Sequence, residues 1–212
     1  MLTSFKQTMK YILMFFIALL HLSVSGQPGD SLKRKPEIEK CMEQVYSTKE
    51  FQQIADSLKM PVSELCDYPV IFPIKKPERI SSGFGMRYHP IYKRRKFHTG
   101  IDISGIKGTP VYASGNGVVI RKGYNSEYGN YIEIRHAGGF RSFYAHLSRT
   151  MVNVGDSIEI ARQIACVGST GIATGSHLHY EIRKGNRYLN PIGWCYLLFE
   201  MKIQTAKYQS NE

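Results

Sequence analysis

The stretch His177-Leu178-His179-Tyr180-Glu181-Ile182 alternates polar and apolar side chains, which is the period of a half-buried β-strand. Four more short runs upstream of it are apolar or alternating, at residues 111–113, 117–120, 131–134 and 141–144. Turn-forming residues such as Gly108-Thr109-Pro110 separate them. Because no long helical pattern lies between these runs, we expect an antiparallel sheet folded on itself and not a series of βαβ units.

A helical segment precedes this β-rich region. Apolar residues recur at helical spacing from Pro36 to about Leu58, with a break near Ser47-Thr48, where Thr48 could cap a second helix. Phe51 and Ile54 would then face inward. The fold class we expect is therefore mostly β: a compact antiparallel β-sheet domain with a small N-terminal helical segment. That segment could be a pro-segment or a packing arm, and residues 54–65 faintly resemble half of a LysM wall-binding module.

The first 25 residues have the features of a secretory signal peptide. Lys6 and Lys10 precede an apolar run from Tyr11 to Leu20, and Ser23-Val24-Ser25 supplies small residues for cleavage. The apolar run is shorter than the roughly 20 residues that span a bilayer, which favours cleavage over a retained membrane anchor. We expect an exported protein of the periplasm or cell envelope, which meets the membrane only through this segment if it is not cleaved.

The chain is basic, with 28 Lys and Arg against 17 Asp and Glu and a net charge of +11. Loss of Lys6 and Lys10 with the signal peptide lowers this charge by two, to +9. Outside the cytoplasm a positive surface meets wall polymers and anionic lipid, so we expect no nucleic-acid partner. The basic runs at 33–35 and 93–96 are interpreted first as solvated loops and second as binding patches.

Export permits disulfides among Cys41, Cys66, Cys166 and Cys195, which allow three full pairings. Cys41 and Cys66 flank one helical segment and are the pair we favour. Cys166 lies in an apolar run and could be a buried thiol.

Five polar residues form the candidate site. His98 and Asp102 are four residues apart and share a face of an extended segment, as His177 and His179 do at spacing two. Burying an unpaired polar group costs about 1 to 3 kcal/mol, a cost that a shared metal removes. His146 ends another expected strand. Glu181 shares a strand face with His177 and His179, so it could be a ligand or a base.

Two imidazoles and a carboxylate with water form a known type of catalytic zinc set, because three protein ligands leave one position open on a tetrahedral ion. One Zn²⁺ held in this way lowers the pKa of its water to about 7 and polarises a carbonyl. The two remaining histidines would orient the water, transfer its proton and stabilise the oxyanion. The pattern predicts a hydrolase, with His89 and His136 as bystanders.

Several motifs also resemble one known family. Residues 82–91, SGFGMRYHPI, resemble the opening of the LytM/lysostaphin-type metallopeptidases, family M23, and FHTGID at 97–102 is similar to their first metal motif. Further similar motifs follow in the family's order, at 108–111, 115–119, 128–131, 144–147, 154–156, 168–171 and 175–181. The resemblance covers roughly residues 72 to 193.

The resemblance implies a compact antiparallel β domain with one zinc ion in a groove. By it, the metal ligands are His98, Asp102 and His179, the catalytic residues are His146 and His177, and Glu181 lies behind the ligands. The implied activity is zinc-dependent endopeptidase action on peptidoglycan stem peptides or cross-links, in which zinc-bound water attacks the carbonyl with His146 and His177 assisting.

Two alternatives stay open: a catalytically silent wall-binding or hydrolase-activating module, and a zinc peptidase that acts on a protein. The expected organisation is a signal peptide at 1–25, a leader and helical segment at 26–71, an M23-like peptidase domain at 72–194 and a C-terminal tail at 195–212.

Overall fold

The computed structural model describes residues 30–75, 79–89 and 92–209, so the predicted signal peptide lies outside the described residues. Residues Glu37–Glu212 form one compact unit. Met1–Pro36 form another, of which only residues 30–36 are described. In the described part of the chain, no helix is long and apolar enough to cross a bilayer.

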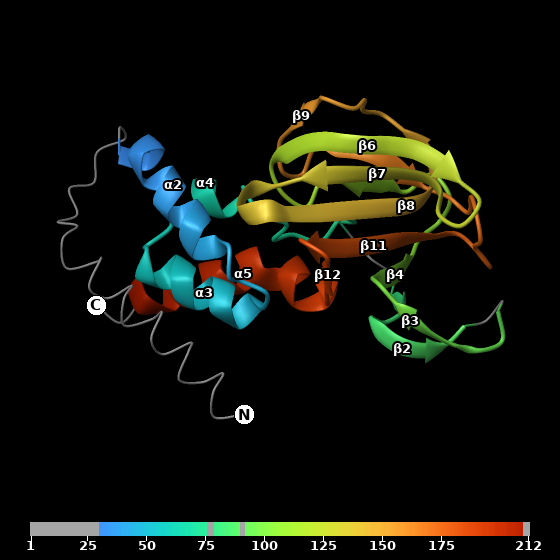
Figure 1. Cartoon of the computed structure of the whole chain (residues 1–212), viewed down its shortest axis with the longest axis horizontal. Helices are drawn as coiled ribbons and strands as arrows, with labels where there is room; N and C mark the ends of the chain where they lie inside the picture. Colours follow the sequence, from blue (N-terminus) through green and yellow to red (C-terminus); the bar gives the residue numbers. More distant parts are fainter. Residues whose placement is uncertain (1–29, 76–78, 90–91, 210–212) are drawn as a thin grey trace. The chain divides into compact units, whose positions relative to one another are not determined.

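The fold is mostly antiparallel β, which confirms the fold class expected from the sequence (Figure 1). Over the described residues, one sheet has ten strands and contains the path β1-β4-β11-β8-β7-β6-β9; β12 pairs with β11, and β10 with β5 and β8. Strands β2 and β3 form a separate hairpin. The strands are β1 (Ile80–Ser82), β2 (Gly85–Tyr88), β3 (Arg95–His98), β4 (Ile101–Ser104), β5 (Pro110–Tyr112), β6 (Gly117–Asn125), β7 (Gly129–Arg135), β8 (Phe140–Thr150), β9 (Ser157–Ile158), β10 (Gln163–Val167), β11 (His177–Lys184) and β12 (Arg187–Leu189).

All five apolar runs taken as strands lie on or overlap β5, β6, β7, β8 and β11. Strand β11 has the predicted alternation, since Leu178, Tyr180 and Ile182 belong to the hydrophobic core. His179 and Glu181 alternate with them along the strand and therefore point to its other face. One strand thus contributes to the core and to the candidate site.

The helices are α2 (Asp30–Met42), α3 (Thr48–Ser57), α4 (Val62–Leu65) and α5 (Pro191–Gln209). The N-cap of α3 is Ser47, one residue before the expected Thr48. Its side chain accepts a hydrogen bond from the Glu50 backbone N–H, while the Glu50 carboxylate accepts from the Ser47 backbone. This reciprocal capping box satisfies two N–H groups that the helix itself leaves unpaired. Phe51 faces inward as expected and is fully buried.

The segment after Trp194, expected as a tail, continues α5, so the predicted boundary at residue 195 falls inside a helix. Trp194 and Leu197 are buried in the core. The ring of Trp194 lies 5.5 Å from that of Phe51 in α3, edge to face. The run from Trp194 to Met201 is apolar on several helical faces. Its sequence therefore lacks the amphipathic pattern from which a surface helix is predicted.

Lys184, the last residue of β11, is buried and connects the sheet to the helical segment. Its ammonium donates hydrogen bonds to the carbonyl oxygens of Met42 and of Val45, the latter at 2.9 Å. Burial lowers the pKa of Lys184 to about 8. This contact and the burial of Phe51 attach the segment to the β-rich part of the unit.

Cys41, Cys66, Cys166 and Cys195 all carry thiols in the structure, so the favoured Cys41–Cys66 disulfide is not formed. Cys166 is buried in β10, as its apolar surroundings suggested.

Replacing Phe51 by Ala should destabilise the whole unit. The substitution leaves a cavity between Tyr68 and Trp194, for which a cost of about 3 to 5 kcal/mol is typical. We expect a single thermal transition at a clearly lower temperature. Lys49→Ala, on the exposed side of α3, should leave the transition in place. Equal melting temperatures for the two variants would mean that α3 is not part of the cooperative fold.

Candidate active site

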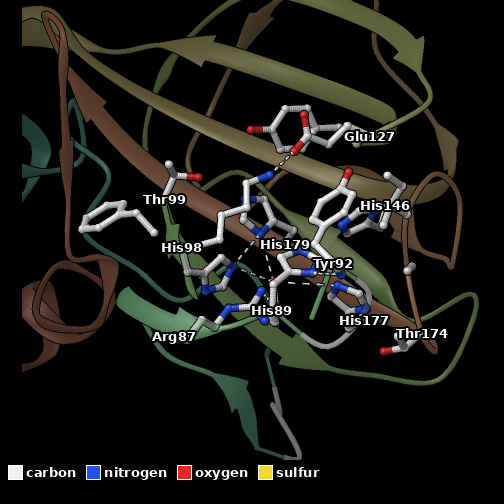
Figure 2. Close-up of a pocket in the computed structure, with 16 residues that line it drawn as sticks. Arg87, His89, Tyr92, His98, Thr99, Glu127, His146, Thr174, His177 and His179 are labelled. Atoms are coloured by element: carbon white, nitrogen blue, oxygen red, sulfur yellow. Dashed lines mark hydrogen bonds and ion pairs between the residues drawn. The ribbon is translucent and has the colours of Figure 1, made fainter. Parts of the chain in front are cut away.

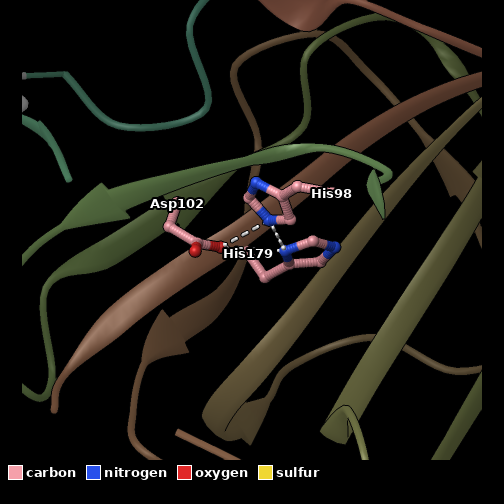
Figure 3. Close-up of side chains that lie close together, drawn as sticks. All are labelled: His98, Asp102 and His179. Atoms are coloured by element: carbon pink, nitrogen blue, oxygen red, sulfur yellow. Dashed lines mark hydrogen bonds and ion pairs between the residues drawn. The ribbon is translucent and has the colours of Figure 1, made fainter. Parts of the chain in front are cut away.

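The structure brings His98, Asp102 and His179 together from three strands, as Figure 3 shows, with one ligand-type atom of each residue within 4.8 Å of the others. Nδ1 of His179 lies 2.9 Å from Oδ1 of Asp102 and 3.1 Å from Nε2 of His98. Antiparallel pairing of β4 with β11 sets His179 directly opposite Asp102. The three side chains predicted as metal ligands therefore converge on one point.

The chain between His98 and Asp102 is not the single extended segment expected from the sequence. β3 ends at His98 and pairs with β2, whereas β4 begins at Ile101 and joins the large sheet. Gly100 lies in the bend between them, where an added Cβ would approach the Tyr180 carbonyl oxygen to 2.2 Å. Glycine is required there because β11 passes so close to the backbone.

The outward-facing nitrogens of both histidines are satisfied by acceptors. Nδ1 of His98 donates to the Gly83 carbonyl oxygen at 2.7 Å, which leaves Nε2 for a ligand. Nε2 of His179 lies 2.9 Å from the Glu181 carboxylate, so Nδ1 faces the cluster. Metal-ligating histidines usually have a partner on the second ring nitrogen. Two nitrogens and one carboxylate held in this way fit a divalent metal ion of the zinc type.

Strong electrostatic coupling joins these groups. Burial alone would lower the pKa of His179, but hydrogen bonds to Asp102 and Glu181 raise it to about 9. Burial would raise the pKa of Asp102, but hydrogen bonds from His179 and His98 hold it well below its usual range. A metal ion must therefore replace a proton at His179 to reach the nitrogen that faces the cluster.

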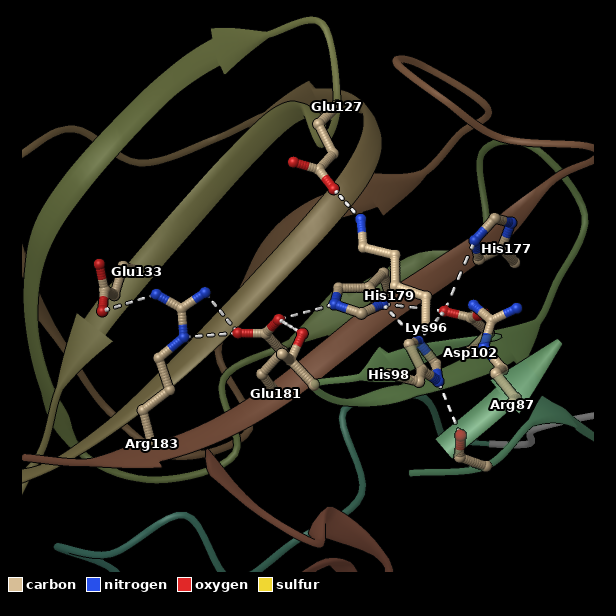
Figure 4. A network of polar contacts seen from close by, with 12 residues as sticks. Arg87, Lys96, His98, Asp102, Glu127, Glu133, His177, His179, Glu181 and Arg183 are labelled. Carbon is tan, nitrogen blue, oxygen red and sulfur yellow. Dashed lines mark hydrogen bonds and ion pairs between the residues drawn. The ribbon is translucent and has the colours of Figure 1, made fainter. Parts of the chain in front are cut away.

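A chain of buried charges continues behind His179 (Figure 4). Glu181 is fully buried and accepts hydrogen bonds from Thr99 and from Arg183. The Arg183 guanidinium also reaches the buried Glu133, at 3.7 Å. Arg121 and Arg141 pair with Glu133 at 3.1 and 3.2 Å. Glu181 thus lies behind His179, a candidate ligand, and it is itself held by Arg183 from a second side.

His146 and His177 complete the set, with ring centroids 4.7 Å apart in the groove shown in Figure 2. Nδ1 of His146 donates to the Thr170 carbonyl oxygen at 2.8 Å, and Nδ1 of His177 donates to that of Gly175 at 2.9 Å. These bonds fix the tautomer, so each ring has Nε2 left for chemistry. Nε2 of His177 lies 3.7 Å from Oδ1 of Asp102.

His146 has two properties that suit a neutral base. Burial lowers its pKa to about 4, so the imidazole is uncharged at neutral pH. Its backbone has a φ of +59°, a left-handed conformation that is unfavourable for a residue with a side chain. Such conformations concentrate at functional sites.

Comparison with known proteins agrees with this geometry. The model of Peptidase family M23 matches residues 96–191. The catalytic domain of the antimicrobial peptidase lysostaphin from Staphylococcus simulans superposes with a TM-score of 0.51 at 30% identity, over 55% of this chain and 91% of that domain. The chain belongs to peptidase family M23.

Two curated relatives are similar over about the same share of the chain. The DD-carboxypeptidase/endopeptidase Mpg of Neisseria meningitidis serogroup B is 48% identical over 114 residues, which are 54% of this chain and 26% of Mpg. The peptidoglycan DD-endopeptidase ShyC of Vibrio cholerae is 40% identical over 114 residues, 53% of this chain and 26% of ShyC. The chain spans about a quarter of the length of these relatives.

The groove of this M23 chain also contains residues outside the five predicted site residues. His89, expected to be a bystander, lines the groove beside Arg87 and Lys96. His136 is a bystander as expected: it is buried outside the groove and bonded to the Asn116 carbonyl and the Ser142 hydroxyl. Arg87 and Lys96 bound the segment that the family resemblance places among the loops around the groove, and the β2–β3 hairpin brings both residues into its lining.

Glu181→Gln should weaken zinc binding by about 10- to 100-fold, because removing a carboxylate behind a ligating histidine has this typical effect. Competition with a chromophoric chelator measures the affinity, and a thermal melt checks the fold. Glu127→Gln removes an exposed carboxylate at the groove rim and should bind zinc like the parent protein. Equal affinities for Glu181→Gln and Glu127→Gln would contradict the positioning role.

Zinc affinity of the stripped protein should rise with pH. Below a pKa of about 9 the His179 ring carries a proton that the metal displaces, so each unit of pH removes competition worth roughly tenfold. Titrations at about pH 6.5 and pH 7.5 test this expectation. A constant affinity across that interval would show that no proton is released at His179.

Proposed function

We propose that this M23 peptidase is a zinc endopeptidase that hydrolyses peptide bonds in the stem peptides or cross-links of peptidoglycan. The observation that carries the proposal is the convergence of His98, Asp102 and His179 in a groove that also presents His146 and His177. We assign the first three as ligands of one zinc ion and the other two as catalytic residues.

A zinc ion held by these ligands supplies a Lewis acid that polarises a carbonyl and makes water acidic near neutral pH. The protein supplies the rest. Glu181 and the Gly83 carbonyl fix the two ligating rings, so the site is formed before substrate binds.

His146 and His177 act on protons and on developing charge. Nε2 of the neutral His146 can accept a proton from the attacking water and return it to the leaving amine, because Thr170 holds the opposite nitrogen. His177, whose Nδ1 is held by Gly175, can donate a hydrogen bond from Nε2 to the oxyanion only when it is protonated. The two rings thus have complementary roles.

Peptidoglycan as substrate is supported by the similarity to ShyC, a peptidoglycan DD-endopeptidase, and to Mpg, a DD-carboxypeptidase/endopeptidase. The signal-peptide pattern of residues 1–25 also supports it. Action in the envelope or periplasm follows from the same proposal. The complete five-residue set favours an enzyme over the silent wall-binding or activating module. None of residues 37–71 lines the groove, so the helical segment leaves it open to a polymer.

The purified protein should convert cross-linked muropeptides into monomers, with activity lost to a chelator and restored by zinc. His146→Ala should lower turnover by about 10²- to 10⁴-fold, the typical contribution of a general base. His136→Ala is the matched control, because it removes a buried histidine outside the groove and should affect stability alone. Undiminished cleavage by the chelated protein or by His146→Ala would overturn the proposal.

A further inference from the structure

Arg87 of β2 lies in the groove beside the candidate ligands, as Figures 2 and 4 show. Its side chain is 27% exposed, and Nη2 lies 3.4 Å from Oδ2 of Asp102. This is the oxygen that faces away from His98 and His179, since both histidines approach Oδ1. The guanidinium is therefore one side chain away from the centre of the site.

The hydrogen-bonding capacity of Arg87 is not used up. Its Nε is buried and has no hydrogen-bond partner within the described ranges 30–75, 79–89 and 92–209. The contrast is Arg183, whose Nε donates to Glu181 and whose charge is shared with Glu133. A guanidinium carries five N–H donors and no acceptor, so a buried unpaired donor indicates a position suited to an anionic partner.

The charge around Arg87 also favours an anion. Lys96, which lies directly opposite Arg87 in the β2–β3 hairpin, is paired with Glu127 at 2.7 Å, and Glu181 is paired with Arg183. Among the described residues, Asp102 is the one carboxylate paired with Arg87, and it is already shared with two histidines. A divalent cation and the guanidinium together outweigh this one carboxylate, so the groove is left with a positive excess.

We propose that Arg87 is a specificity-determining residue that binds a free carboxylate on the substrate residue next to the scissile amide. This inference rests on the proposed function and narrows its substrate class. The site then selects peptides whose amine-side residue carries its own free α-carboxylate, as in a direct cross-link between D-residues. A bond inside a glycine bridge has a neutral amide at that position and gains nothing from Arg87.

The position of Arg87 explains why the recognised carboxylate must be adjacent to the bond. Arg87 contacts a candidate ligand directly, so a group that it binds lies within about one residue of any carbonyl hydrolysed there. The hairpin carries further positive charge on Lys93, Arg94 and Arg95, but these side chains are exposed and do not line the groove. They can attract an acidic polymer without selecting a bond.

Two muropeptide dimers with direct D,D cross-links test the proposal: one has the amine-side carboxylate free, and the other has it converted to a carboxamide. The parent protein should cleave the free acid with a kcat/KM about 10- to 100-fold higher, the usual worth of a charge-assisted hydrogen bond. Arg87→Gln should lose this preference, mainly because its kcat/KM for the free-acid dimer falls. Arg95→Gln removes an equal charge from an exposed position of the same hairpin, and this variant should keep the preference for the free acid.

A role for Arg87 in merely orienting Asp102 predicts something different. Arg87→Gln would then lose zinc and would slow both substrates equally, a result that overturns the proposal. Equal cleavage of the two dimers by the parent protein overturns it as well, while leaving the peptidase function intact.

Binding to zinc-loaded His146→Ala provides a readout apart from turnover. Calorimetry should show tighter binding of the free acid, and the added Arg87→Gln change should abolish the difference. If neither dimer is cleaved, the proposed function fails, but the binding measurement still shows whether Arg87 recognises the carboxylate. Equal or undetectable binding of both dimers would refute the carboxylate site.

Discussion

The antiparallel pairing of β4 with β11 is the constraint on which the site depends. It sets His179 opposite Asp102, and His98 arrives from β3 across the bend at Gly100. Side chains alternate between the faces of a strand, so a slip of one residue would turn His179 into the core and Leu178 into the groove. The hydrophobic side chains of β11 forbid that slip, because they fill the core from the other face. The fold therefore determines the geometry of the candidate metal cluster.

The same strand connects the site to the far end of the unit. His177, His179, Glu181 and Arg183 alternate along one face of the strand. Lys184 ends the strand and donates to the carbonyl groups of Met42, the last residue of α2, and of Val45 just after it. Burying Glu181 and Glu133 without partners would be prohibitive, which is why arginines accompany both. Each charge in this chain fixes the next, so His179 has little freedom to rotate. Ligands held in advance lose less entropy on binding a metal.

Much of the fold and of the candidate site could be predicted from the sequence, because the patterns involved are local or periodic. Alternation predicted the strands, and the short spacings within His98–Asp102 and His177–His179 predicted shared faces, although the first pair spans two strands. Contacts between segments that are distant in the chain could not be predicted from the sequence. The positions of Arg87 and His89 depend on how the β2–β3 hairpin folds over the groove, and α5 has an apolar surface without a one-sided period. The Cys41–Cys66 pairing was wrong because flanking a helix does not determine the distance between two thiols.

The charged side chains in and behind the site differ in one respect that bears on function. Glu133 and Glu181 are compensated by arginines within the fold, and Lys184 by carbonyl oxygens. Such groups contribute to the shape of the site and need nothing from outside. Arg87 is compensated only by a carboxylate that the candidate metal cluster also uses, and one of its donors is unpaired among the described residues. Folding alone gains little from a guanidinium in that position. An anion that arrives with the substrate would complete its coordination, and selectivity would then come from the same charge that the fold leaves unbalanced.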